Sequence, residues 1–213
     1  MKVLNLYAGI GGNRKLWKDV DVTAVEINLD IAKIYQDFFP DDKVIVGDAH
    51  EYLLKHFKEF DFIWSSPPCP THSKMKLFCK SNNKQMGNEN REPEYIDFKL
   101  YQEIILLNHF ANGNKWVIEN VKSYYKPLIK PILIDRHYFW SNFHIAYIET
   151  EYGGDIRQGQ CKELSKVKDV NIDNYKIEGR RKDAVIRSYF SPILGKHIFD
   201  CAFKLVQKPL TYR

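Results

Sequence analysis

A cysteine and a glutamate, each beside an apolar segment, are the residues in this chain best suited to chemistry. Cys69 follows FDFIW in the stretch SSPPCPTHS, and Glu119 lies in KWVIENV. A cysteine thiolate is a nucleophile, and a glutamic acid can exchange a proton with a substrate. Taken singly, Cys69 could be a buried structural thiol and Glu119 a partner in an ion pair. At the ends of neighbouring strands, they favour one shared pocket with a nucleophile and an acid.

A second set of residues predicts a site for an adenosine-containing ligand. The glycines of YAGIGG, residues 7–12, allow a sharp turn, and Glu26 follows at about the interval from which an acid reaches a ribose hydroxyl. Asp48, in GDAH, could accept a hydrogen bond from an adenine amino group. The sequence has no GxxxxGK[ST] motif for a polyphosphate, which favours S-adenosylmethionine as the cofactor. The alternatives are a purely structural glycine turn, a capping or exposed Glu26, and an N-cap role for Asp48.

The hydrophobic pattern places these residues at the ends of strands in a mainly parallel sheet. Strand-like and helix-like segments alternate, which predicts right-handed βαβ units with helices on both faces. The predicted strands are residues 2–9, 22–28, 43–48, 60–66 and 115–121, followed by a β pair of residues 137–143 and 144–150. The predicted helices are residues 13–18, 29–39, 49–57, a segment within 92–112, and a last helix after Pro192. Ligands of such sheets bind beyond the carboxyl ends of the strands, where the candidate residues converge.

The composition is that of a globular protein. With 213 residues, 44% hydrophobic and 28% charged, the chain can bury one core. No apolar run approaches the roughly 18 residues of a membrane span, and the N-terminal segment lacks the pattern of a signal peptide. The four cysteines show no CxxC spacing, which argues against a zinc site and a disulfide framework. We therefore expect a cytoplasmic monomer with no membrane contact and no metal.

The positive charge is concentrated after Cys69. The net charge is +5, and two polar stretches rich in Lys and Arg, residues 74–91 and 150–186, show little helical or strand periodicity. Each could be an ordinary solvated stretch. Beside a nucleotide-type pocket, they could instead contact the phosphates and bases of a nucleic acid.

The order of these motifs resembles that of the DNA (cytosine-5) methyltransferases. YAGIGG is similar to the family's FxGxG cofactor motif, VEIN to its ribose-binding acid, GDA to its adenine-contacting aspartate, PPCPTHS to its PCxxxS nucleophile motif and ENV to its catalytic glutamate motif. The resemblance implies a Rossmann-like, mainly parallel α/β sheet flanked by helices, the class I S-adenosylmethionine-dependent methyltransferase fold. It also implies a catalytic domain of residues 1–149, a small target-recognition insertion of residues 150–186, and a C-terminal segment of residues 187–213 that completes the catalytic domain.

The resemblance further implies a reaction and the residues that perform it. Cys69 would add to C6 of a cytosine flipped out of double-stranded DNA, Glu119 would stabilise the ring, and S-adenosylmethionine would methylate C5. The implied cofactor-binding residues are Tyr7, Ala8, Gly9, Gly11, Gly12, Glu26, Ile27, Asp48, Ala49, Pro67 and Leu100. The implied DNA-binding residues are Ser73, Lys74, Lys76, Lys80, Lys84, Arg91, Arg157, Gln158, Arg180 and Arg181.

Some positions depart from the family pattern or allow another interpretation. The family's QxRxR segment is represented only by DRHYFWSNF, in which Arg136, or His137 beside it, would supply the catalytic cation; a plain surface arginine is the alternative. Leu100 equally fits a core position. For the whole chain, the alternatives are an RNA cytosine-5 methyltransferase, a catalytically silent nucleic-acid-binding relative and an amino-group methyltransferase with an SPPY-type motif. The presence of both Cys69 and Glu119 disfavours the last two.

Overall fold

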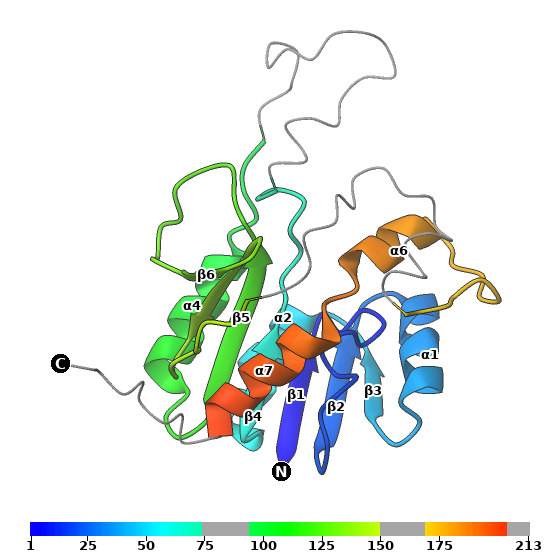
Figure 1. Cartoon of the computed structure of the whole chain (residues 1–213), viewed down its shortest axis with the longest axis horizontal. Helices are drawn as coiled ribbons and strands as arrows, with labels where there is room; N and C mark the ends of the chain where they lie inside the picture. The colour runs from blue at the N-terminus through cyan, green and yellow to red at the C-terminus, as the bar shows by residue number, and fades with distance from the viewer. Residues whose placement is uncertain (74–93, 150–168, 204–213) are drawn as a thin grey trace, which may run out of the picture.

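The computed structural model describes residues 1–73, 94–149 and 169–203, which contain a seven-stranded sheet (Figure 1). The strand order is β3-β2-β1-β4-β5-β7-β6. The first five strands in this order are parallel, and β7 runs antiparallel to both β5 and β6. The bounds are β1 (Lys2–Leu6), β2 (Asp21–Glu26), β3 (Lys43–Val46), β4 (Phe62–Ser65), β5 (Lys115–Val121), β6 (Ile132–Ile134) and β7 (His137–Ser141). The predicted mainly parallel α/β sheet is confirmed.

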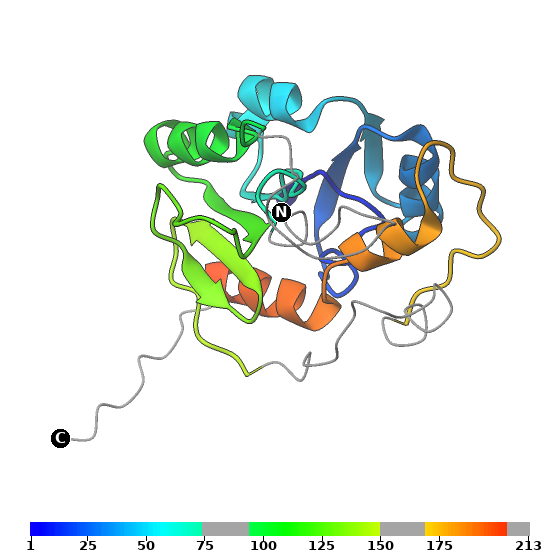
Figure 2. The same cartoon turned by 90° about the horizontal axis from the view of Figure 1, so that it is seen from above.

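Helices cover both faces of this sheet (Figure 2). α2 (Ala49–His56) and α4 (Lys99–Phe110) lie on one face, and α7 (Pro192–Phe203) lies on the opposite face. α1 (Leu29–Phe38) lies beside β2 and β3, with α6 (Lys182–Ser188) next to it. A short 3-10 helix, η1 (Phe57–Glu59), follows α2.

The alternation of side chains along β1 explains the two cores. Leu4 and Leu6 point to the face covered by α2 and α4, where they join a cluster that includes Leu53 of α2. Val3 points to the other face and joins a cluster with Ile198 of α7. Successive residues of a strand face opposite sides of the sheet, so a strand buried on both sides reads as an almost continuous apolar run.

The predicted helix over residues 13–18 is wrong, because this stretch forms consecutive turns. The N–H of Trp17 donates to the carbonyl of Arg14, three residues back. The Trp17 side chain is only 3% exposed, and its Nε1 donates to the carbonyl of Gly195. So short a segment gains little from helix formation, and burial of the Trp17 ring decides its conformation.

The predicted pairing of residues 137–143 with residues 144–150 is also wrong. β7 pairs with β5 on one side and with β6 on the other, and residues 144–149 form no strand. A tight turn at Asp135 and Arg136 joins β6 to β7, and Asp135 adopts the left-handed φ of 55° that suits a two-residue hairpin turn.

Residues 169–189 pack against α1. Ile172 and Ile186 are fully buried and contact a cluster that includes Ile31 and Ile34 of α1. α6 runs across the predicted boundary between residues 186 and 187. The division into a catalytic domain, an insertion and a C-terminal segment stays a prediction, because residues 150–168 and 204–213 lie outside the described residues.

Candidate active site

The strand order brings the predicted site residues to one edge of the sheet. β2, β1, β4 and β5 are consecutive neighbours. Glu26 ends β2, Tyr7 follows β1, Cys69 follows β4 by four residues, and Glu119 lies near the end of β5. Because these strands are parallel, their carboxyl ends share one edge, so the residues predicted to bind the cofactor lie next to those predicted to do chemistry.

The glycine turn after β1 combines a packing role with an open position. A Cβ on Gly11 would lie 2.2 Å from a ring carbon of Phe39, and a Cβ on Gly12 would lie 2.4 Å from the carbonyl oxygen of Phe190. Gly9 differs, because nothing lies within 4 Å of the place where its Cβ would be, although its φ is +55°. Gly11 and Gly12 therefore let the turn pack against its neighbours, while Gly9 leaves room for a ligand.

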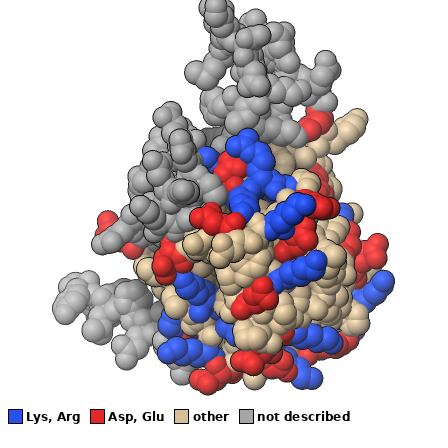
Figure 3. All heavy atoms as spheres, turned by 90° about the vertical axis from the view of Figure 1, so that its right-hand side faces the viewer, with Lys and Arg blue, Asp and Glu red and all other residues tan. Residues whose placement is uncertain are grey.

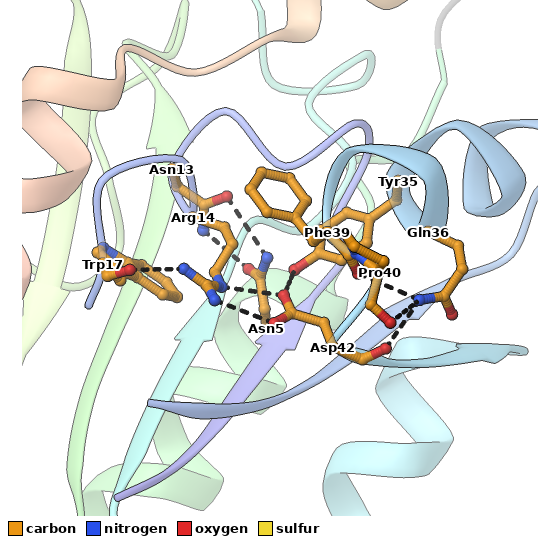
Figure 4. A network of polar contacts seen from close by, with 9 residues as sticks. All are labelled: Asn5, Asn13, Arg14, Trp17, Tyr35, Gln36, Phe39, Pro40 and Asp42. Carbon is orange, nitrogen blue, oxygen red and sulfur yellow. Dashed lines mark hydrogen bonds and ion pairs between the residues drawn. The ribbon is translucent and has the colours of Figure 1, made fainter. Parts of the chain in front are cut away.

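Buried polar side chains hold the chain that follows this turn (Figure 4). Asn13 Nδ2 donates to Asn5 Oδ1 at 2.8 Å, and Asn5 is fully buried in β1. Arg14 donates to both carboxylate oxygens of Asp42, at 2.9 and 3.0 Å, and the Tyr35 hydroxyl donates to the same carboxylate at 2.8 Å. A bidentate arginine–carboxylate pair fixes orientation as well as distance, so residues 9–17 are tied to α1 and to the segment before β3.

Glu26 faces this turn. Glu26 is only 6% exposed. Its Oε2 accepts the Gly9 N–H at 3.0 Å, and its Oε1 accepts the Asn28 N–H at 3.0 Å. Asn28, and not Glu26, is the N-cap of α1. Each carboxylate oxygen has a further lone pair, so both can still accept a ribose hydroxyl. Ile27, the next residue, is 69% exposed and offers an apolar side chain for an adenine ring.

Asp48 is the N-cap of α2, which is one of the two roles that the sequence predicted for this residue. Its Oδ1 accepts the N–H groups of His50 and Glu51, and Lys99 Nζ of α4 contacts its Oδ2 at 3.1 Å. Burial alone would raise the pKa of Asp48, but the hydrogen bonds from Lys99 and from the two N–H groups lower it. Asp48 is therefore an ionised acceptor. The predicted contact with an adenine amino group stays a prediction.

The remaining predicted cofactor residues lie around this edge in different environments. Ala8 and Ala49 are buried, at 6% and 3% exposure. Leu100 of α4 is 2% exposed and belongs to the core cluster between the sheet and the helices α2 and α4. It therefore occupies the core position that was the alternative to a role in cofactor binding. Tyr7 has a left-handed φ of 54°, and its hydroxyl donates to Glu103 Oε1 at 2.6 Å.

The loop that carries Cys69 is attached to the end of β5. Asn120, the residue after Glu119, donates from Nδ2 to the carbonyl of the buried Pro67 at 3.0 Å. The N–H groups of His72 and Ser73 both donate to the Cys69 carbonyl, and Ser73 forms an isolated β-bridge with Ser123. These contacts hold the half-buried Cys69 at a fixed place beside Glu119.

The thiol of Cys69 is kept in its protonated form. Burial, together with the negative charge of the Glu119 carboxylate, raises the pKa of Cys69 to about 11, and the charge of Arg180 acts in the opposite direction. The two side chains of the predicted catalytic pair are thus close enough to interact electrostatically. Any attack by Cys69 near neutral pH requires that its proton be removed during the reaction.

Glu119 is hydrogen-bonded to His137, whose Nδ1 lies 2.6 Å from Oε1. The antiparallel register pairs Val121 with His137 and Glu119 with Phe139, so Glu119 and His137 are diagonal neighbours across β5 and β7. The Phe190 ring packs edge-on against His137, with ring centroids 5.1 Å apart. The sequence identified His137 only as the alternative to Arg136. The sequence feature that could have identified His137 is the segment HYFWS, if it is interpreted as an antiparallel strand next to the strand that contains ENV.

Arg136 lies in the exposed turn between β6 and β7. Its backbone carbonyl accepts the N–H of Lys122, and within the described residues its side chain makes no hydrogen bond to Glu119. The structure thus brings His137, and not Arg136, to the predicted catalytic glutamate, Glu119. A catalytic role for Arg136 stays a prediction without structural support.

The predicted DNA-binding residues are described only in part. Ser73 lies at the end of the Cys69 loop, and Arg180 and Arg181 precede α6. Arg181 donates to both carboxylate oxygens of Asp183 at 3.0 Å. Figure 3 shows Lys and Arg side chains gathered on the upper part of the face formed by α1 and α6, with Asp and Glu among them. Seven predicted residues lie outside the described residues: Lys74, Lys76, Lys80, Lys84, Arg91, Arg157 and Gln158.

In the described ranges, no cluster of three or more His, Cys, Asp or Glu residues is arranged to hold a metal ion. In those same ranges, no helix is both long enough and apolar enough to cross a bilayer.

Comparison with known proteins adds a family to this geometry. Residues 1–128 match the model of the C-5 cytosine-specific DNA methylases, a span that includes Tyr7, Glu26, Asp48, Cys69 and Glu119. The chain belongs to the C-5 cytosine-specific DNA methylase family. The resemblance predicted from the sequence motifs is therefore confirmed.

Individual relatives match parts of the chain. A tRNA (cytosine(38)-C(5))-methyltransferase of Spodoptera frugiperda is 28% identical over 142 residues, which are 63% of this chain and 40% of that protein. The crystal structure of a DNMT2 variant from Spodoptera frugiperda is 29% identical, with a TM-score of 0.37, over 57% of this chain and 35% of the other. A TehB-like SAM-dependent methyltransferase of Corynebacterium glutamicum is 15% identical, with a TM-score of 0.34, over 56% and 54% of the two chains. The chain spans about two fifths of the length of the curated relative it matches.

S-adenosylmethionine is the cofactor of this family, as the sequence predicted. The residues of the site fit its adenosine end. Gly9 leaves open space beside Glu26, whose carboxylate oxygens retain lone pairs for ribose hydroxyls, and the exposed Ile27 can pack against a base. Asp48 remains available as a charged acceptor at the neighbouring helix start.

Proposed function

We propose that the protein methylates C5 of cytosine in double-stranded DNA. The observation that carries this proposal is the attachment of the Cys69 loop to β5, which sets a nucleophile beside Glu119 at the edge of the sheet where the cofactor-binding residues lie. Cytosine C5 is a poor nucleophile, so a catalyst must first change the ring covalently. A thiol and a carboxyl group close enough to interact electrostatically are suited to that task.

The proposed role of Cys69 and Glu119 is a coupled addition. Sγ of Cys69 forms a bond to C6, the C5–C6 π pair moves to form a C4–C5 double bond, and the C4–N3 π pair moves to N3, which gains a proton. The thiol proton of Cys69 balances that gain if Glu119 passes it on to N3. Because burial and Glu119 hold the pKa of the thiol at about 11, a free thiolate is scarce, and a transfer during the attack avoids its formation.

His137 is proposed to hold the Glu119 carboxyl group in position for this transfer. Its 2.6 Å contact fixes one carboxylate oxygen and leaves the other for the substrate ring. When bound, S-adenosylmethionine supplies an electrophilic methyl group to the carbon that the addition has made nucleophilic. A base, such as solvent water, then accepts the C5 proton, the C5–C6 double bond re-forms as the bond from C6 to Sγ breaks, and the N3 proton returns through Glu119 to Sγ, which releases Cys69 and restores the ring.

Base flipping belongs to this proposal, because neither C5 nor C6 can be reached inside a stacked duplex. Unstacking and unpairing one base costs a few kcal/mol, which contacts in the pocket and with the phosphates would offset. Arg180 is a candidate for such a contact, since its charge already acts on Cys69.

RNA is the second candidate substrate. The specific observation in its favour is the similarity to a tRNA (cytosine(38)-C(5))-methyltransferase over 63% of this chain. The proposed chemistry at the cytosine ring is the same for both nucleic acids. What distinguishes them is the surface that receives the flanking nucleotides.

The decisive experiment offers labelled S-adenosylmethionine with either a cytosine-containing DNA duplex or a tRNA transcript. Digestion and chromatography then identify the methylated nucleoside. We expect 5-methylcytosine from the duplex, no product with Cys69→Ser, and a covalent complex with a duplex that carries 5-fluorocytosine. Cys201→Ser is the matched control, because Cys201 is a buried free cysteine on α7 and away from the site.

Three results would contradict the proposal. Methyl transfer to the amino group, or full activity in Cys69→Ser, would exclude the covalent mechanism. A larger kcat/KM with tRNA than with any duplex would move the substrate from DNA to RNA.

A further inference from the structure

A second glutamate, Glu103 of α4, contacts three segments at the edge of the sheet where the predicted cofactor-binding residues lie, which is called the cofactor-binding edge below. It is fully buried and accepts hydrogen bonds from the Tyr7 hydroxyl at 2.6 Å and from the Ser65 hydroxyl at 2.6 Å. His50 Nδ1 lies 3.0 Å from the same carboxylate. Tyr7 opens the glycine turn after β1, Ser65 ends β4 shortly before Cys69, and His50 lies in the first turn of α2.

These contacts differ from a general structural ion pair because two of the three partners, Tyr7 and His50, are next to predicted cofactor-binding residues. Tyr7 precedes Ala8 and Gly9, and His50 follows Asp48 and Ala49. One turn before Glu103 on the same helix, Lys99 contacts the Asp48 carboxylate at 3.1 Å. α4 therefore attaches the start of α2 through two charged side chains, while Glu103 also holds the ends of β1 and β4.

The Tyr7 contact bears on the shape of the turn. Tyr7 has a φ of 54°, a left-handed conformation that costs free energy for a residue with a bulky side chain and persists only where its surroundings enforce it. The 2.6 Å hydrogen bond from its hydroxyl to a buried carboxylate is such a constraint. Burial and the neighbouring Glu103 carboxylate raise the pKa of the Tyr7 hydroxyl, so it stays a proton donor.

We propose that Glu103 is a positioning residue for the cofactor, which holds Tyr7, Ser65 and His50 so that the glycine turn and the Asp48 helix start together accept the adenosine end of S-adenosylmethionine. This proposal rests on the proposed function for the identity of the ligand. It gives the buried carboxylate a role that the chemistry at Cys69 does not use.

The proposal predicts a pH dependence of cofactor affinity. The hydrogen bond to Glu103 raises the pKa of His50, against the opposing effects of burial and of Lys99, and with a further contribution from Asp48. The charged His50–Glu103 pair is therefore complete at low pH and weakens as the pH rises through the pKa of His50 in the folded protein. We expect the affinity for the cofactor to decrease in the same direction.

The experiment measures the Kd of S-adenosylhomocysteine by titration calorimetry with the full chain at pH 6.0 and 8.5. For Glu103→Gln we expect a Kd about tenfold larger than that of the wild type, because the charged carboxylate that accepts from Tyr7 and Ser65 and contacts His50 is lost. Gln102→Ala, an exposed neighbour on α4, is the matched control and should bind as the wild type does. His50→Gln keeps a donor but cannot titrate, so its Kd should change less between the two pH values than the Kd of a His56→Gln control, which retains His50 and should change as the wild type does.

A double-mutant cycle tests the positioning role directly. If Glu103 acts through Tyr7, Tyr7→Phe weakens binding in the wild type and adds little in Glu103→Gln. Should Glu103→Gln fail to fold, Tyr7→Phe and Ser65→Ala, which each remove one hydroxyl, decide the question.

The outcomes separate this proposal from the function on which it rests. If the wild type binds no S-adenosylhomocysteine, the cofactor assignment fails. If the wild type binds it and Glu103→Gln, Tyr7→Phe and Ser65→Ala bind equally well, the proposed role of Glu103 is excluded while the proposed function stands.

Discussion

Two buried glutamates at the same edge of the sheet, Glu103 and Glu119, differ in how their oxygens are occupied. Glu103 is 0% exposed and accepts from Tyr7, Ser65 and His50. Glu119 is 8% exposed and, within the described residues, is hydrogen-bonded through Oε1 to His137 alone. Both have a histidine within 3.0 Å.

The difference separates a structural role from a chemical one. A fully buried carboxylate with most of its lone pairs already used holds its partners in place and has little capacity left for a substrate. A carboxylate with a free oxygen beside a nucleophile can exchange a proton with a bound ring. Burial near a strand end does not by itself distinguish the two cases, but the number and identity of the donors do.

The largest expected effect comes from replacing Glu119, in which one carboxylate oxygen contacts His137 and the other is left for a substrate. Glu119→Gln removes the exchangeable proton and should reduce the rate of methyl transfer by about 10²–10⁴-fold. Its affinity for S-adenosylhomocysteine should stay within about twofold of the wild type, which is the opposite pattern to Glu103→Gln. Single-turnover rates and calorimetry on both variants would measure this. Equal losses of rate and affinity in Glu119→Gln would remove the distinction.

A smaller effect is expected at His137. His137→Ala deletes a charge-assisted hydrogen bond, worth about 1.5–3 kcal/mol, so kcat should fall by about ten- to a hundredfold. His137→Arg restores a hydrogen-bond donor to the Glu119 carboxylate, so it should recover part of the activity lost in His137→Ala when kcat is measured at one pH.

Arg136→Ala is the control for this comparison. Its side chain lies in the exposed turn, so its loss should leave kcat unchanged. A larger loss in Arg136→Ala than in His137→Ala would show that the arginine, as the motif resemblance implied, supplies the catalytic cation.

The sequence predicted the sheet correctly and identified Cys69 and Glu119 as a candidate pair, because these signals are local. The apolar strands, the glycine turn and the residues that follow each strand can be read directly from the chain. The partners of the two glutamates could not be read in this way. Glu103 meets Tyr7 and His50, which are 96 and 53 residues away, and only the strand order and the placement of α4 bring them together.

The errors have physical causes as well. The segment at residues 13–18 has a helix-like pattern, but the burial of Trp17 overrides it. The strand at residues 137–141 was correctly located but assigned the wrong neighbour, because the pattern of an antiparallel strand does not identify its partners. That same pairing places His137, and not Arg136, beside Glu119.

A third prediction uses the thiol itself. With its pKa at about 11, Cys69 should react with iodoacetamide about tenfold faster for each pH unit between 7 and 10. Glu119→Gln removes the negative charge that contributes to this shift and should increase the rate several-fold at pH 8. Mass spectrometry of the intact protein, with Cys69→Ser to account for the other three cysteines, would measure it. An unchanged rate in Glu119→Gln would mean that the two groups do not interact.

The smallest expected effect is on the free energy of unfolding, and it tests the contact between Glu103 and His50. Because the pKa of His50 is raised above its ordinary value of 6.5 by Glu103, the pair contributes fully to the free energy of unfolding below that value. The contribution is lost as the pH rises through the pKa of His50 in the folded state. Urea unfolding should therefore show a stability difference between the wild type and His50→Gln that shrinks from pH 5.5 to 8.5.

An exposed pair of the same kind sets the scale for this last effect. His56 and Glu59 lie 2.7 Å apart, with side chains 36% and 59% exposed. Water and salt screen such a pair, so His56→Gln should change stability little at any pH. If His50→Gln and His56→Gln give the same small difference at every pH, the Glu103 carboxylate does not hold a charged histidine. Its contacts with Tyr7 and Ser65 would then have to position the cofactor-binding edge without His50.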